Sequence, residues 1–454
     1  MVWRQRRMLV LALSAAAWLA AAQAHAQQGQ GVEVDAAGVL RTRVVHDPTG
    51  MLGRQRLAAA RASLDPEIAR PSPLRMVSLT RLERLAAEHM ATGQGLPDDM
   101  RYLAGLTRLS HVFIYPETGE IVIAGPAEGF VPDITGRVVG MQTGRAVLQL
   151  QDLVVALRAY PPGATQMPAL VVSIDPSPEG LERMQQFLLQ VGGRALPGDT
   201  QQIVNGLQES LGLQTVRIEG VPARTHFAQV MVEADYRMKL IGIGLEEPPV
   251  RIPSYVSRAN PRDVSRNALQ RWYFTPNYEC VKVSEDELAM ELVGDGVQLV
   301  GEDQLVQAGG ERVVSGRVDR ASQAFVQAFT QRYPELAARE PVYAQLRNLI
   351  DMAIAAAFMQ EYDYYGQVGW QAEVFRDEQR FPVETYPEPK QVETAVNAVW
   401  RGNTLMTPIG GGISIRPELA LQSARLLADE NGLLGTLRQE IDREDLDPER
   451  WWWD

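Results

Sequence analysis

Three residues of one predicted helix are spaced so that they could do chemistry together. His226, Glu233 and Arg237 lie at positions i, i+7 and i+11 of a helix predicted over 225–240, so they share one face. A carboxylate close to an imidazole favours the charged ring. If both side chains were partly buried, Glu233 could therefore tune His226 toward general-base catalysis.

The same helix has a second interpretation that needs no catalysis. Glu233 with Arg237, and Asp235 with Lys239, stand four residues apart and can form ion pairs along a polar face. The segment would then be an ordinary amphipathic helix. Sequence spacing alone does not separate the two interpretations.

Asp175 is a third catalytic candidate. An apolar strand predicted over 169–174 ends just before it, and a helix is predicted to begin at Pro178. In α/β sheets, ligands bind at the carboxyl ends of the strands. The alternative is that Asp175 or Ser177 caps this helix by accepting hydrogen bonds from its first N–H groups.

A mixture of carboxylates and aromatic rings follows a long predicted helix and forms a candidate ligand-binding surface. Such a mixture is typical of sugar-binding surfaces and glycosidase clefts. The alternative is a helix end whose rings pack inside the protein. The residues are Glu361, Tyr362, Asp363, Tyr364, Tyr365 and Trp370, of which Glu361, Asp363, Tyr364 and Trp370 are the candidate ligand contacts.

The sequence lacks the motifs of several enzyme classes. Lysine occurs only at Lys239, Lys282 and Lys390, and none follows a glycine, so there is no phosphate-binding loop of the Walker type. The single cysteine, Cys280, and the absence of paired histidines at i, i+4 leave no zinc motif, and Gly242-Ile243-Gly244 lacks the third glycine of a dinucleotide fingerprint. We therefore expect no metal and no cofactor, and we expect Cys280 to lie in the core.

Apolar periodicity predicts a mixed α/β and α+β fold. Strands and helices alternate over 36–250, which indicates an α/β lobe, and a connector with four prolines follows it. A second lobe over 262–420 is expected to combine an antiparallel β-meander with a helical C-terminal region. Gly294–Gly296 should close the last hairpin of the meander. Gly410–Gly412 should form a hairpin turn or flexible loop, or bring the backbone close to a ligand.

The first 26 residues are expected to be a cleaved export signal. Three arginines precede an apolar run over 8–22, and Ala24-His25-Ala26 is a small-x-small cleavage site. The run is shorter than the roughly 20 residues of a membrane-spanning helix. A short linker over 27–35 would then begin a soluble chain in the periplasm or outside the cell.

The charge of the chain limits its partners. Loss of the three signal arginines would lower the formal net charge from −12 by three, to −15. An acidic chain is repelled by phosphate backbones, so we expect no nucleic-acid partner. An envelope protein or a glycan is the expected kind of partner, and no membrane span is expected after signal cleavage.

The segment 421–454 is predicted to contain a helix and an acidic stretch that ends in Trp451-Trp452-Trp453-Asp454. Three exposed indoles would be unfavourable in water. They either fold back onto the body or anchor a partner, and we expect them to fold back.

Five stretches of the chain carry a family resemblance: 102–106, 123–129, 173–180, 225–239 and 271–274. They resemble a secreted bacterial family catalogued as a domain of unknown function (number 1598). The resemblance extends over about residues 33–420 and implies that the two lobes belong to one module. It implies no activity, cofactor or catalytic residue.

Two hypotheses of function remain. The first is an exported binding or envelope-assembly protein, which the acidic composition and the missing catalytic motifs favour. The second is an exported hydrolase that acts on glycan or peptide through carboxylates and His226. One pocket shared by His226, Glu233 and Asp175 would favour the hydrolase, whereas scattered residues, or closed ion pairs on the surface, would exclude it.

Overall fold

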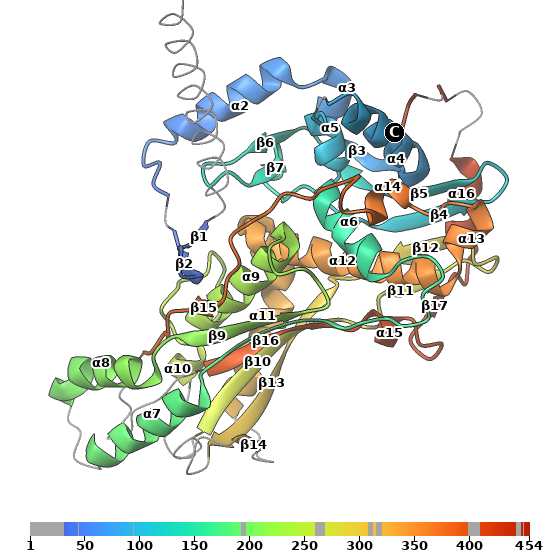
Figure 1. Cartoon of the computed structure of the whole chain (residues 1–454). Helices are drawn as coiled ribbons and strands as arrows, with labels where there is room; N and C mark the ends of the chain where they lie inside the picture. The colour runs from blue at the N-terminus through green and yellow to red at the C-terminus, as the bar shows by residue number, and fades with distance from the viewer. Residues whose placement is uncertain are drawn as a thin grey trace, which may run out of the picture.

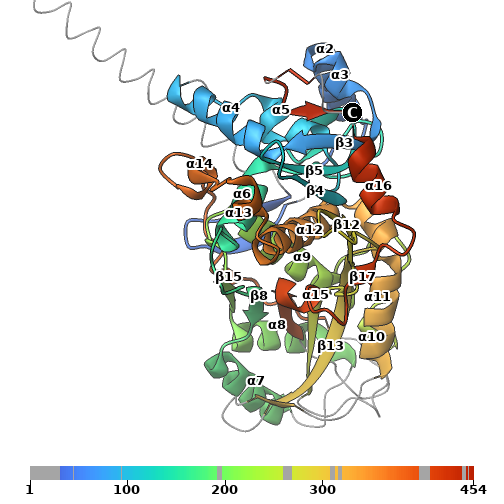
Figure 2. The ribbon, with the colours of Figure 1, turned by 90° about the vertical axis from the view of Figure 1, so that its right-hand side faces the viewer.

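Strands rich in apolar residues form two β-sheets with two buried helices between them in the computed structural model (Figures 1 and 2). The structure describes residues 31–43, 45–93, 95–191, 197–258, 268–306, 312–314, 320–397, 409–441, 446–447 and 449–454. The mixed α/β and α+β class expected from the sequence is confirmed.

The larger sheet is mixed. Its β10 runs parallel to β16 and antiparallel to β13, whereas β8 is antiparallel to both of its neighbours. In spatial order the nine strands are β1 (Val32–Val34), β2 (Val39–Thr42), β15 (Gln391–Val392), β9 (Gln214–Glu219), β8 (Leu170–Asp175), β16 (Ile409–Ile415), β10 (Ala268–Pro276), β13 (Val297–Val306) and β14 (Arg312–Val314).

The second sheet is built around the antiparallel hairpin of β4 and β5. In spatial order the seven strands are β17 (Leu427–Ala428), β11 (Val281–Val283), β12 (Ala289–Leu292), β4 (His111–Tyr115), β5 (Glu120–Ala127), β3 (Ser72–Ser78) and β18 (Trp452–Trp453). A separate small hairpin joins β6 (Phe130–Pro132) to β7 (Val138–Gly140).

Two helices, α9 (His226–Gly242) and α12 (Pro341–Glu361), lie between the sheets in both views (Figures 1 and 2). The segment 352–359 of α12 is buried on all sides, as its apolar sequence predicts. The other helices surround the sheets. They are α2 (Met51–Ser63), α3 (Pro66–Ala69), α4 (Leu79–Ala91), α5 (Asp98–Arg101), α6 (Leu150–Ala159), α7 (Pro178–Val191), α8 (Thr200–Leu211), α10 (Tyr255–Arg258), α11 (Arg320–Arg339), α13 (Tyr364–Val368), α14 (Glu373–Arg376), α15 (Pro417–Ala420) and α16 (Leu433–Glu440).

Local patterns located most of these elements correctly. Ser78 is of a residue type that caps helices, and its Oγ accepts a hydrogen bond from the Arg81 N–H at the start of α4. The strand expected over 169–174, the helix expected from Pro178 and the helix expected over 225–240 are confirmed as β8, α7 and α9.

The predicted antiparallel meander is wrong in its pairing. β10 and β13 pair with each other in the larger sheet, whereas β11 and β12 form a hairpin in the other sheet, where β12 pairs with β4. Gly294–Gly296 therefore carries the chain from one sheet to the other and closes no hairpin. Burial gives the physical reason, because Ala289, Met290 and Leu292 of β12 are buried where this strand joins β4.

The glycine triplet Gly410–Gly412 was expected in a turn or loop, but it lies inside β16, between β10 and β8. A Cβ atom on Gly411, whose φ is +143°, would lie 1.9 Å from the carbonyl oxygen of Trp272. A Cβ on Gly412 would lie 2.0 Å from the carbonyl oxygen of Val172. The glycines let two neighbouring backbones approach this strand more closely than any side chain would allow.

Strands from both sides of the proline-rich connector pair with each other. β16 joins β8 in the larger sheet, and β12 joins β4 in the smaller one. The expected lobes 36–250 and 262–420 therefore contribute to both sheets. In segment 421–454 the three indoles are buried, so the prediction that they fold back is confirmed.

The predicted export signal over 1–26 and the first part of the linker over 27–35 lie outside the described residues, and they stay predictions. A search of the described helices for one with the length and apolarity of a membrane span found none.

We expect replacement of Gly411 by alanine to lower the free energy of unfolding by roughly 3 kcal/mol or more, because the new methyl group overlaps backbone atoms that cannot rotate away. Chemical denaturation of the purified protein measures this. Gly198→Ala is the matched control, since a Cβ there meets open space, and it should change stability by less than about 1 kcal/mol. Equal stability of the two variants would contradict the tight packing of β16.

Candidate functional site

The predicted catalytic helix, α9, is almost wholly inside the protein. It begins after Thr225, whose side chain accepts a hydrogen bond from the Ala228 N–H, and only Arg237 and Leu240 escape burial. It packs on β8 and β16 of the larger sheet and on α12. Its polar residues therefore need partners within the protein, because unpaired buried polar groups are costly.

His226 is 1% exposed and is paired with Asp152 of α6, not with Glu233. Its Nδ1 lies 2.7 Å from Asp152 Oδ2. The amide groups of Gln149 and Gln345 face its Nε2 at 3.4 and 3.3 Å. Since amide N–H groups donate, Nε2 accepts and Nδ1 carries the proton toward Asp152.

Glu233 is also buried, and its partner is Arg137, which precedes β7. Both carboxylate oxygens lie 2.5 Å from Arg137 Nη2, and Arg237 Nη1 lies 3.6 Å from Oε1. Arg137 further donates to Gln345 Oε1 at 3.2 Å. Gln345 therefore links the environment of His226 to that of Glu233, although the two side chains have different ionic partners.

Arg237 lies at the edge of this group and binds two more carboxylates. Its guanidinium approaches Glu246 and Glu340, each at 2.7 Å. These hydrogen bonds outweigh burial, which opposes the charge, and they raise the pKa of Arg237. The predicted pair Glu233–Arg237 exists, but it is part of a network that reaches the start of α12.

Asp175 lies at the end of β8 in a different cluster. Arg271 of β10 donates to its Oδ2 at 2.9 Å. Nearby, Lys239 donates to Asp235 Oδ2 at 2.7 Å and to the carbonyl of Ile174 at 3.1 Å, so the second predicted pair of α9 is confirmed. Burial raises the pKa of Asp235 and lowers that of Lys239, against the attraction between the two charges.

The alternative reading of the β8–α7 junction as a cap is confirmed for one of its two residues. Ser177 Oγ accepts a hydrogen bond from the Gly180 N–H at 3.0 Å. Asp175 faces Arg271 instead.

The three catalytic candidates are thus placed in closed ionic environments. His226 and Glu233 share a buried network, whereas Asp175 belongs to the cluster of Arg271 and Lys239. Their partners Asp152, Arg137 and Arg271 are distant in sequence, and no local spacing pointed to them. Pairs of this kind hold elements of the fold together.

The aromatic and acidic segment after α12 divides into buried rings and exposed carboxylates. Tyr364 and Tyr365 are buried, and Trp370 Nε1 donates to the buried Glu83 at 2.5 Å. Asp363 accepts from the Gly366 N–H at the start of α13. Glu361 is exposed and lies at a shallow cavity of about 360 Å³ with Glu418. The rings face the interior, so they offer no stacking platform for a sugar.

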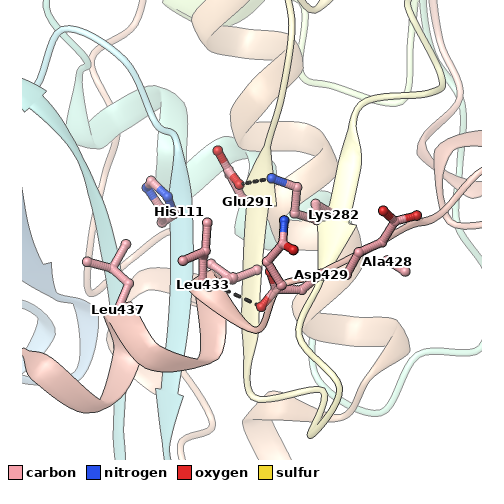
Figure 3. Close-up of a pocket in the computed structure, with 10 residues that line it drawn as sticks. His111, Lys282, Glu291, Ala428, Asp429, Leu433 and Leu437 are labelled. Atoms are coloured by element: carbon pink, nitrogen blue, oxygen red, sulfur yellow. Dashed lines mark hydrogen bonds and ion pairs between the residues drawn. The ribbon is translucent and has the colours of Figure 1, made fainter.

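An open pocket of about 440 Å³ lies where α16 and the preceding turn meet the second sheet (Figure 3). Sequence reasoning missed it, because its residues come from segments far apart in the chain. It is lined by His111 of β4, Lys282 of β11, Glu291 of β12, the segment Ala428–Asn431, and Leu433, Leu434 and Leu437 of α16.

Some polar side chains of this pocket have partners among the described residues, and others do not. Lys282 Nζ lies 2.6 Å from Glu291 Oε2, so these two charges neutralise each other (Figure 3). Asp429 Oδ2 accepts from the N–H groups of Leu434 and Gly435 and so caps α16. Within the described part of the chain no cation pairs with Glu430, which is exposed.

His111 forms part of the pocket wall. Its ring stacks on Phe113 at 5.5 Å, and its Nδ1 lies 3.1 Å from Ser110 Oγ. Burial lowers the pKa of His111, so the ring is neutral at pH 7. The pocket thus has a net negative charge from Asp429 and Glu430.

Cys280 is buried, as expected, and burial raises its pKa to about 12. The thiol therefore stays protonated and unreactive at neutral pH. In the part of the chain that the structure describes, no group of three or more His, Cys, Asp or Glu side chains could hold a metal ion.

Comparison with known proteins gives a match to one family model over part of the chain and no activity. Residues 172–255 match the model of a family described as "Protein of unknown function (DUF1598)". This stretch runs from β8 to the start of α10, so it contains Asp175, His226 and Glu233, and the expected resemblance is confirmed over these residues. Comparison with curated proteins and with solved structures found no match.

We expect Glu233→Ala to lower the free energy of unfolding by about 3–5 kcal/mol, because it leaves the buried Arg137 without its carboxylate. Urea denaturation followed by circular dichroism measures the change. Glu335→Ala is the matched control, since Glu335 pairs with Arg332 on the surface of α11, and it should cost no more than about 1 kcal/mol. Similar losses in both variants would contradict a structural role for the network.

Proposed function

We propose that this chain is an exported binding protein that holds a segment of a partner polypeptide in the pocket between α16 and the second sheet. The observation that carries the proposal is the composition of this pocket. It combines an exposed apolar side chain, Leu433 at 68% exposure, with the acidic Glu430 beside a neutralised Lys282–Glu291 pair. Aliphatic surface with net negative charge suits a segment that carries apolar and basic side chains.

The backbone next to the pocket supports a polypeptide ligand. β17 is the edge strand of the seven-stranded sheet, and its inner side pairs with β11. An edge strand offers N–H and carbonyl groups to an added extended segment, while pockets beside it select side chains. Leu427 of this strand is 37% exposed, which extends the apolar surface of the pocket.

A glycan ligand is less well supported. None of the described residues that line the pocket is Trp, Tyr or Phe, so no large ring is available to stack on a sugar. The rings of Tyr364, Tyr365 and Trp370, which suggested a glycan site in the sequence, lie inside the protein.

The hydrolase alternative lacks a supporting observation. His226 is 1% exposed, and its Nδ1 is engaged by Asp152. Neither of the two cavities described above includes His226, Glu233 or Asp175. A general base must reach the proton that it removes, so these side chains are better suited to holding the fold.

Export is the remaining part of the proposal and rests on the predicted signal over 1–26. It places the binding protein in the periplasm or outside the cell, where a polypeptide of the cell envelope is the expected partner.

We expect the full chain to bind a fluorescent peptide of alternating leucine and lysine, and to bind the leucine and glutamate counterpart at least about tenfold more weakly. Leu433→Asp should lower the affinity for the basic peptide at least about tenfold, because it puts a charge into the apolar surface. Fluorescence anisotropy measures both affinities.

The control for this experiment is Leu189→Asp, which makes the same change at a residue of α7 that is 82% exposed and lies outside the pocket. It should leave binding unchanged. Equal binding of the two peptides, or equal effects of the two variants, would refute the assignment of the pocket.

A further inference from the structure

The other edge of the seven-stranded sheet is occupied by the last residues of the printed sequence. Trp452 and Trp453 form β18, which pairs antiparallel with Val77 and Met76 of β3. The Ser78 N–H donates to the carbonyl of Trp451 at 2.8 Å, which continues the pairing. This is the arrangement in which a peptide adds a strand to a sheet edge.

The side chains of this segment enter separate hydrophobic clusters. Trp451 and Trp452 pack in the main core, whereas Trp453 packs in a smaller cluster with Met76 and Phe113. All three indoles are at most 8% exposed. The indoles of this strand are therefore buried in two different hydrophobic clusters, and pockets for individual side chains are the basis of sequence selectivity in strand addition.

A buried arginine of β3 binds the carboxylate that follows the indoles. Arg75 is fully buried, and its Nε and Nη2 lie 2.7 and 3.0 Å from the two side-chain oxygens of Asp454. The same guanidinium lies over the Trp452 ring at 4.6 Å from its centre. One arginine thus recognises both an aromatic ring and a carboxylate two residues later.

Arg75 is held in place by the body of the protein. Its Nη1 donates to the carbonyls of Ile68 and Ala104, and its Nη2 donates to those of Glu67 and Arg70. None of these four carbonyls belongs to the segment that Arg75 binds. The carboxylate clamp is therefore positioned in advance, which is a feature of a binding site.

We propose that the edge of β3, with Arg75 as its carboxylate clamp, is a recognition site for an extended polypeptide segment in which two aromatic residues precede an acidic one, and that Trp451–Asp454 occupies it as an internal ligand. A partner protein with such a segment binds here by displacing these residues. The site lies at the edge opposite β17, so it is separate from the pocket of the proposed function.

The pKa of Asp454 is consistent with the binding of its carboxylate by Arg75. Burial would raise its pKa, but the hydrogen bonds and the positive charge of Arg75, together with hydrogen bonds from Ser72 and Arg70, outweigh burial and lower the pKa of Asp454. The bound carboxylate thus has a lower pKa than the free one, so binding is full above the ordinary aspartate pKa of about 3.9 and weakens as the pH falls below it.

The test uses the full chain with Trp452→Gly and Asp454→Lys together, which removes the main contacts of the internal ligand and leaves Arg75 intact. A fluorescent peptide with the sequence of residues 450–454 should bind this variant at least about tenfold more tightly than it binds the wild-type chain, where the internal ligand competes. The peptide with asparagine in place of the aspartate should bind about 10- to 100-fold more weakly. Binding of the acidic peptide should decrease below about pH 4.

Glu449→Gln is the control, because Glu449 contacts Arg84 on the surface and lies outside the clamp. Its peptide binding should equal that of the wild type. Circular dichroism must give the double variant the same helix content as the wild type. If the folded double variant does not bind the peptide, or binds the asparagine peptide equally well, the recognition site is refuted.

Discussion

Burial of charged side chains on α9 is the constraint on which the rest of the structure depends. The helix lies between two sheets, so each charged or polar side chain that it carries needs a partner inside the protein. Arg137 before β7 pairs with Glu233, and Glu340 before α12 pairs with Arg237. Asp152 of α6 accepts from His226, and the carbonyl of Ile174 in β8 accepts from Lys239. Hydrogen bonds and ion pairs thereby connect α9 to segments that extend from Arg137 to Gln345 in the chain.

The same constraint explains why α9 resembles a catalytic helix in the sequence. A histidine, a glutamate and an arginine on one face are the residue types that acid–base catalysis uses, and they are also those that a buried helix uses to bind its neighbours. A catalytic role and a structural role differ in whether the side chain already has a partner inside the protein. Nδ1 of His226 is bound to Asp152, and both oxygens of Glu233 are bound to Arg137. These atoms therefore stabilise the fold. Function is therefore better sought at the surface, at the edges of the second sheet.

Local elements could be predicted from the sequence because their causes are local. The capping of α4 by Ser78, the turn between β4 and β5, and the apolar surface of 352–359 are each encoded within a few residues. The folding back of the three indoles followed from the cost of exposing them.

The pairing of strands that are distant in sequence could not be predicted. It depends on which edge strand of a sheet is still unpaired and on which apolar strand face is still exposed. β12 satisfies both conditions at β4, so the expected meander splits between the sheets. Gly411 and Gly412 looked like a turn because the carbonyls of Trp272 and Val172, which exclude a side chain there, come from other strands. The pocket beside α16 has the same origin, since His111, Lys282 and Leu433 are brought together only by the sheet.

The backbone groups at the two edges of the seven-stranded sheet are protected in two different ways. An uncovered edge pairs indiscriminately with other chains, so proteins cover it or place charges beside it. At β3 the indoles and the Arg75–Asp454 pair cover the edge, so under the inference above a partner would have to displace them. At β17 the strand is only two residues long, and Asp429 and Glu430 follow it directly. Their negative charge repels a second acidic copy of the chain, and the same charge would attract the basic segment of the proposed function.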